Sequence, residues 1–147
     1  MKRKYSFGLV IFFVGWCSLL TSCKIKPKPL KLGVDQCDYC MMTISDAKFG
    51  GELITKKGKI YIFDDPHCVI SFIKEKKVSQ PEIREVLLTD YSGQHELVNV
   101  NLTHLYKSDE LRSPMGGNIA AFRDIDSLNF LMKAYTGVRV VWDDLVR

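Results

Sequence analysis

The stretch IFDDPHCVISFIK, residues 62–74, decides the first half of the fold. Its first residues complete a run of β-forming side chains, Lys59–Phe63. Asp65-Pro66 then supplies an N-cap acid followed by proline at the first helical position. Apolar side chains follow at helical spacing and form one face: Val69, Phe72 and Ile73. The stretch therefore predicts a strand that leads directly into an amphipathic helix.

A second stretch, AAFRDIDSLNFLM at residues 120–132, repeats this order. Phe122 and Asp124 align with Phe63 and Asp65, and a second apolar helical face follows: Leu128, Leu131 and Met132. Strand candidates flank both helices: Glu52–Thr55, Lys59–Phe63, Arg84–Tyr91, Leu97–Val100, Leu105–Tyr106, Asn118–Phe122 and Val138–Trp142. We therefore expect an α+β chain of two related ββαβ units, residues 36–92 and 93–147. One continuous α+β domain is the alternative.

Composition places the chain among ordinary globular proteins. It has 147 residues, of which 46% are hydrophobic and 26% charged. After residue 22 there remain 18 basic and 17 acidic side chains, a balance that gives no reason to expect nucleic-acid binding. Only one apolar run is long enough to matter for a membrane, so a polytopic membrane protein is excluded.

The N-terminus has the pattern of an export signal. Lys2-Arg3-Lys4 precedes the apolar run Ser6–Leu20, and Leu20-Thr21-Ser22-Cys23 resembles a bacterial lipobox. We expect a lipoprotein signal peptide at residues 1–22 and lipidation of Cys23. An ordinary signal peptide or an uncleaved anchor is the alternative, and all three place the remaining chain outside the cytoplasm. Residues 23–35, with lysine alternating with proline, are expected to form an extended tether.

Cysteine usage points to metal or redox chemistry. Three thiols remain after the expected tether: Cys37, Cys40 and Cys68. They cannot all pair within one molecule, and an oxidising compartment disfavours spare thiols. Cys37 and Cys40 form a Cys-x-x-Cys pair that Met41 and Met42 follow directly. Thiolate and thioether sulfur are soft donors that favour Cu(I) over hard cations, although methionines also fill gaps in cores.

Further candidates lie later in the chain. Met115 stands in a Pro/Gly-rich loop, Arg112–Gly117, which presents a methionine instead of burying it. Cys68 lies in the first turn of the expected helix, where the helix dipole lowers a thiol pKa, but it also suits a simple buried position. His67 beside it fits a surface or capping role. The acid pairs Asp64-Asp65 and Asp143-Asp144 are explained by capping.

The sequence resembles the NosL family, lipoproteins that accompany nitrous-oxide reductase assembly. The resemblance rests on the lipobox, CDYCMMTISD, IFDDPHC and SPMGGNIAAF, in this order from Cys23 to the last strand. The family typically has Cys-x-x-Cys-Gly-Met and a later Met-Gly. It implies a periplasmic Cu(I)-binding protein that delivers copper to the reductase maturation machinery, with two ββαβ units similar to organomercurial lyase. Met41 departs from the pattern, because the family usually has glycine there.

The resemblance and the residues together give the expected site. Cys40 is expected as the first Cu(I) ligand and Met115 as the second, followed by Met42 and Cys37. Weaker candidates complete the set: Cys68, His67 and Met41. The expected partners are a copper donor, the reductase assembly machinery and a membrane held through the N-terminal lipid. No catalytic residues are expected, so the chain is interpreted as a carrier and not an enzyme.

Three other functions are open on the sequence alone. A thiol–disulfide oxidoreductase would use Cys37 and Cys40, although Met-Met-Thr-Ile is a poor helix opening after such a pair. A structural zinc site would use Cys37, Cys40, His67 and Cys68. A lipoprotein that only scaffolds other factors would leave its thiols incidental.

Overall fold

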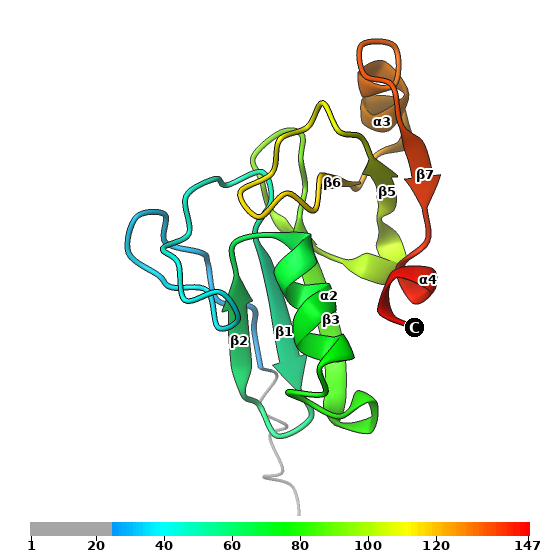
Figure 1. Ribbon diagram of the computed structural model, residues 1–147. Helices are drawn as coiled ribbons and strands as arrows, with labels where there is room; N and C mark the ends of the chain where they lie inside the picture. Colours follow the sequence, from blue (N-terminus) through cyan, green and yellow to red (C-terminus); the bar gives the residue numbers. More distant parts are fainter. Residues whose placement is uncertain (1–24) are drawn as a thin grey trace, which may run out of the picture.

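The computed structural model describes residues 25–147, which form two small sheets with helices packed on them (Figure 1). The expected signal peptide, residues 1–22, and the expected lipidation site, Cys23, lie outside the described residues. No helix within residues 25–147 has the length and apolarity needed to cross a membrane.

The first sheet is antiparallel and has four strands in the order β2-β1-β3-β4. Their bounds are β1 Gly51–Thr55, β2 Ile60–Phe63, β3 Ile83–Thr89 and β4 Leu97–Asn99. The β1–β2 turn requires Gly58, whose φ is +89°. Helix α2, Pro66–Lys74, leaves β2 as the sequence predicts, and the 3-10 turn η2, Gln80–Glu82, leads into β3.

The second sheet has three strands in the order β6-β5-β7. Its elements are β5 His104–Lys107, β6 Ile119–Phe122, helix α3 Ile125–Leu131 and β7 Val138–Val140. The 3-10 turn η3, Val100–Leu102, connects it to the first sheet, and helix α4, Trp142–Val146, closes the chain. The order β5-β6-α3-β7 repeats β1-β2-α2-β3, so the α+β class with two ββαβ units is confirmed. Strand β4, beyond residue 92, pairs with β3 in the first sheet.

The C-terminal strand is shorter than expected. The sequence predicts a strand to Trp142, but β7 ends at Val140 and Trp142 begins α4. Asp143 and Asp144 lie in the first turn of α4, where carboxylates interact favourably with the helix dipole. Three apolar side chains of this segment also pack against the core: Trp142, Leu145 and Val146. Capping charge and packing therefore override the β propensity of the valines.

The two units share one core. Alternate residues of β5 and β6 point to opposite faces of the second sheet. One face, with Leu105, Ile119 and Ala121, joins the core formed by α2 and the first sheet. The other face, with Tyr106 and Phe122, forms a smaller core under α3. The backbone N–H of Tyr91 donates to the Ala121 carbonyl at 2.7 Å, which ties the end of the first sheet to β6.

The first sheet is covered on both faces. Helix α2 packs on the face that carries Gly51 and Leu53. The opposite face carries Glu52, and residues 25–31, here called the strap, lie against it (Figure 1). The Lys28 N–H donates to both Glu52 carboxylate oxygens at 3.0 and 3.2 Å. Part of the expected tether therefore packs on the folded domain.

Candidate metal centre

The three thiols of the folded part meet at one place. One sulfur from each of Cys37, Cys40 and Cys68 lies within 4.8 Å of the other two. Cys37 and Cys68 are fully buried, whereas Cys40 is partly exposed, and all three cysteines are free thiols. Three soft sulfur donors at this spacing can hold a metal ion. Protein covers the cluster at Cys37 and Cys68, and solvent reaches it at Cys40.

A short loop fixed to the edge of β2 positions Cys37 and Cys40. Within the loop, the Cys37 N–H donates to the Met42 carbonyl at 2.8 Å, and the Met41 N–H to the Cys37 carbonyl at 3.0 Å. Asp38 joins it to β2, because its N–H donates to the Ile62 carbonyl and its carboxylate accepts from the Ile62 N–H. The two cysteines therefore sit on a turn that both its own backbone and the sheet stabilise.

The surroundings of Cys37 favour a thiolate there. A hydrogen bond from the Cys68 thiol is the largest effect that lowers the pKa of Cys37; burial opposes it, and backbone N–H groups of Cys40, Asp64 and Tyr39 add to it. The pKa of Cys68 is raised, first by this same hydrogen bond and then by burial. Burial also raises the pKa of Cys40. The cluster thus holds its negative charge on the buried Cys37 and its protons on the other two sulfurs.

Helix α2 brings Cys68 to the cluster. Asp65 caps the helix through Oδ1, which accepts the His67 N–H at 2.7 Å. The Cys68 N–H bonds the Asp65 carbonyl at 2.9 Å and places the thiol in the first turn. The buried first-turn position expected for Cys68 is present, and the same position brings the sulfur to the other two thiols.

The loop that carries Met115 docks on the same helix end. The Met115 N–H donates to Asp65 Oδ2 at 2.9 Å, so one carboxylate holds both the helix start and the loop. Gly117 approaches Asp65 and His67 so closely that a Cβ atom there would clash. Met115 and Cys40 both pack, partly buried, against the core that contains Cys37 and Cys68. Residues 40 and 115 therefore lie on the same core, at the start of α2.

The other candidates lie outside the thiol cluster. Met41 and Met42 are 66% and 53% exposed. Met41 has φ +63°, the left-handed conformation that favours glycine; this is the position at which the NosL pattern has glycine. His67 is exposed, and its Nε2 lies 3.3 Å from the Ser71 hydroxyl. Its ring is thus directed along the surface of α2.

Asp64 was not among the expected site residues, because capping explained the Asp64-Asp65 pair. Only Asp65 caps α2. Asp64 is fully buried, its Oδ1 accepts the Ser45 N–H at 2.8 Å, and its Oδ2 has no hydrogen-bond partner among the described residues. Burial raises the pKa of its carboxyl. The only sequence signal was an acid that precedes the capping acid.

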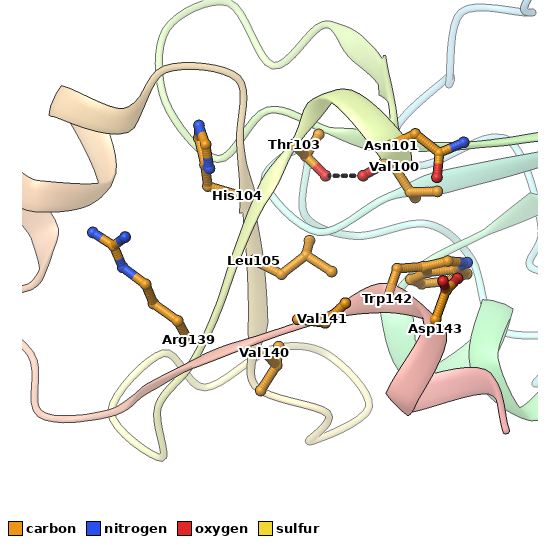
Figure 2. Close-up of a pocket in the computed structure, with 10 residues that line it drawn as sticks. All are labelled: Val100, Asn101, Thr103, His104, Leu105, Arg139, Val140, Val141, Trp142 and Asp143. Atoms are coloured by element: carbon orange, nitrogen blue, oxygen red, sulfur yellow. Dashed lines mark hydrogen bonds between the residues drawn. The ribbon is translucent and has the colours of Figure 1, made fainter.

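None of the three thiols lines the pocket that Figure 2 shows. This pocket, about 400 Å³, is formed by η3, β5, β7 and the start of α4, with His104, Arg139 and Trp142 among its lining residues. Its single drawn hydrogen bond joins the Thr103 hydroxyl to the Val100 carbonyl. Within the described residues, the three thiols are the one group of histidine, cysteine or acidic side chains close enough to share a metal.

Fold and site define a small protein of two ββαβ units that gathers three thiols able to hold a metal ion. The NosL family model matches residues 30–147, and the chain belongs to the NosL family. The crystal structure of the copper chaperone NosL from Shewanella denitrificans is similar, with a TM-score of 0.68 and 21% sequence identity. The match covers 82% of this chain and 95% of that chain. Comparison with curated proteins gave no match.

Proposed function

We propose that this chain is a lipid-anchored, extracytoplasmic Cu(I) carrier that supplies copper for nitrous-oxide reductase maturation. The observation that carries the proposal is the meeting of three sulfurs from two distant segments beside a docked methionine loop. Membership of the NosL family and the fold shared with a copper chaperone support copper as the cargo. The lipobox at Leu20–Cys23 supports the anchor.

The chemistry of the donors suits a carrier. The Cys37 thiolate is buried and accepts hydrogen bonds from the Cys68 thiol and then from backbone N–H groups, so it supplies affinity. Cys40 is the partly exposed thiol, and it is the natural first and last contact of an ion that enters and leaves. Met115 offers a neutral thioether that binds weakly enough to exchange. Stepwise exchange among these sulfurs requires no large change of fold, because the loop and the helix are already in place.

Two alternatives make different predictions. A thiol–disulfide oxidoreductase of the expected type places its Cys-x-x-Cys pair at a helix start, whereas Cys37 and Cys40 lie in an irregular loop and Cys68 occupies the helix. A zinc site built from the three cysteines and His67 requires the His67 ring in the cluster, and that ring lies beside Ser71. Catalysed reduction of a model disulfide, compared with stoichiometric Cu(I) binding, separates the first alternative from the carrier.

The decisive experiment is an anaerobic Cu(I) titration against a competing chelator. We expect Cys40→Ser and Cys37→Ser to weaken Cu(I) affinity by more than the roughly 10–100-fold typical of changes outside the ligand shell. Met115→Ala is expected to weaken it about tenfold, because a thioether contributes less than a thiolate. Cys68→Ser tests the third thiol.

Met132→Ala is the matched control for Met115→Ala, because Met132 is an exposed methionine at the end of α3. It should leave the affinity unchanged. Unchanged affinity in Cys40→Ser would end the assignment of this site, and unchanged affinity in both Cys40→Ser and Met115→Ala would favour a scaffold whose thiols are incidental.

A further inference from the structure

Positive charge is concentrated at the end of the first unit where α2 ends and the β1–β2 turn lies. Four lysines line one open hollow of about 460 Å³ between the β1–β2 turn and the segment after α2: Lys56, Lys57, Lys59 and Lys77. We call these four residues the basic face. All four are exposed, and Lys74 and Lys76 continue the charge on the end of α2. The hollow contains one carboxylate, that of Glu82, which accepts from the Ser79 hydroxyl at 2.7 Å.

The local backbone fixes this arrangement. The Lys56 N–H donates to the Glu82 carbonyl at 2.8 Å and holds the turn against η2. The Lys59 ammonium lies over the Tyr61 ring, 4.3 Å from its centroid. Lys77 makes a loose ion pair with Glu75 at 3.6 Å, and both side chains are about half exposed. Apart from this pair and the cation–π contact, the ammonium groups are available to an external partner.

The charge is local and not a property of the whole domain. Residues 25–147 carry seventeen basic and seventeen acidic side chains and are therefore balanced as a whole. A balanced domain with several lysines at one end has a strong electrostatic polarity, which orients it in an external field. The partner that fits this end is an extended surface of negative charge.

The described chain also begins at this end. Ile25 packs against the turn at Gly58, and the Arg84 guanidinium donates to the Ile25 carbonyl at 3.3 Å. The sequence immediately before Ile25 contains Lys24, Cys23 and the apolar run 6–20. The segment that would hold the chain at a membrane therefore joins the folded domain beside the basic face.

We propose that the basic face docks on anionic lipid headgroups and sets the orientation of the domain on the membrane. This inference rests on the membrane anchoring in the proposed function. Clustered lysines beside an anchor add to its hold on an anionic bilayer, roughly fivefold in binding constant for each lysine near the surface. Helix α2 carries Cys68 in its first turn and Lys74 as its last residue, about 9 Å apart along the helix axis at 1.5 Å per residue. The docked domain thus presents the thiols and the Met115 loop away from the lipid.

The test is lysine footprinting of the full chain reconstituted in vesicles. An amine-acylating reagent is applied in vesicles of phosphatidylcholine alone and in vesicles that also contain phosphatidylglycerol, and labelling is read by mass spectrometry. We expect severalfold slower labelling of all four lysines of the basic face in the anionic vesicles, relative to Lys48 as an exposed reference. The protection should disappear at high salt, because the Debye length falls from about 10 Å at 0.1 M to about 3 Å at 1 M.

Two variants with equal changes of net charge control for non-specific effects. Lys56→Glu/Lys57→Glu should abolish the protection of Lys59 and Lys77, whereas Lys107→Glu/Lys133→Glu, on the second unit, should preserve it. Equal labelling in neutral and anionic vesicles, or equal protection in the two variants, would overturn the inference and leave an acidic protein as the partner of this face. The readout contains no copper, so its failure is distinguishable from a failure of Cu(I) binding.

Discussion

At the scale of single residues, Glu52 is the most unusual side chain of the first sheet. It is a fully buried carboxylate at the second residue of β1. Burial raises its pKa to about 7, and the Lys28 N–H opposes that rise. The Lys28 charge also lowers the pKa, whereas Glu85 and Asp35 raise it. Ionisation of Glu52 near neutral pH therefore destabilises the folded state.

This cost predicts a pH dependence of stability. Between the ordinary pKa of 4.5 and the raised value of about 7, the folded chain retains a proton on Glu52 that the unfolded chain has lost. Stability therefore falls as the pH rises through this window. We expect Glu52→Gln to remove a pH-dependent loss on the order of 2–3 kcal/mol between pH 5 and pH 8, measured by urea unfolding at both pH values.

Glu82→Gln is the control for this measurement. Glu82 is exposed, and hydrogen bonds from Ser79 lower the pKa of its carboxyl. Glu82 contributes to the free energy of unfolding above its ordinary pKa, and this contribution is lost in acid. Between pH 5 and pH 8 the stability of Glu82→Gln should therefore depend on pH as that of the wild type does. Identical profiles for wild type and Glu52→Gln would contradict the assigned role of Glu52.

At the scale of elements, the N-cap residues of the two repeats differ in the number of segments that they hold. Asp124 caps α3 and accepts backbone N–H from Ser127. Asp65 caps α2 in the equivalent position and additionally holds the Met115 N–H. The first repeat therefore uses its cap to attach a loop from the second unit, whereas the second repeat uses its cap for the helix alone.

Alanine substitutions should expose this difference. Asp124→Ala is expected to lower the free energy of unfolding by about 1 kcal/mol, the usual loss of an N-cap. Asp65→Ala should lower it by about 2–3 kcal/mol, because the Met115 N–H also loses its partner. Hydrogen exchange at Met115 should accelerate only in Asp65→Ala, and Cu(I) affinity should fall about 10–100-fold only there. Equal effects of the two variants would show that the Asp65–Met115 bond is energetically unimportant.

The elements were predictable where local signals were strong. Both caps and both helices follow from Asp65-Pro66, from the alignment of Asp124 with Asp65 and from apolar spacing, and the paired strands follow from runs of β-forming residues. Helix α4 was not predictable, because VRVVW has high β propensity and its helix depends on packing of Trp142 against the core. The pairing of β4 with β3 also depends on tertiary contacts, since Leu97–Asn99 would suit either sheet.

The site was predictable in composition but not in geometry. The Cys-x-x-Cys pair, Cys68 and Met115 were all recognisable from the sequence, whereas their meeting depends on the fold of two units. The preference of charge for Cys37 was missed, because it arises first from the Cys68 thiol and then from N–H groups of residues 39, 40 and 64, which meet only in the folded chain. The left-handed Met41 was signalled by the missing glycine of the NosL pattern.

At the scale of the whole molecule, we expect stability not to depend on a metal. Most of the core lies in the two sheets and in α2, and the thiols occupy one end of it. The two sheets are also joined by backbone hydrogen bonds and by packing of α4 on α2. A chain of this kind should fold before it is loaded, as a carrier requires.

Metal removal tests this directly. After treatment with a strong chelator under reducing conditions, the chain should retain its circular dichroism spectrum and a cooperative thermal transition. Added Cu(I) should raise the transition temperature, because it binds the folded chain and not the unfolded one. At a free Cu(I) concentration one hundred times the dissociation constant, the free energy of unfolding should increase by about 2.7 kcal/mol. Cys40→Ser should gain much less. A chain that unfolds on chelation would instead support the structural zinc site.

The strap has a consequence for how far the domain can travel. A free, extended linker of residues 23–35 would span about 40 Å at about 3.1 Å per residue, which would let the domain sample a wide volume around its point of attachment. With residues 25–31 fastened along the sheet, little slack remains between Cys23 and the folded body. On the proposed function, a protein that collects copper from this chain has to come to it, and the bilayer surface sets the geometry of that encounter before the two proteins touch.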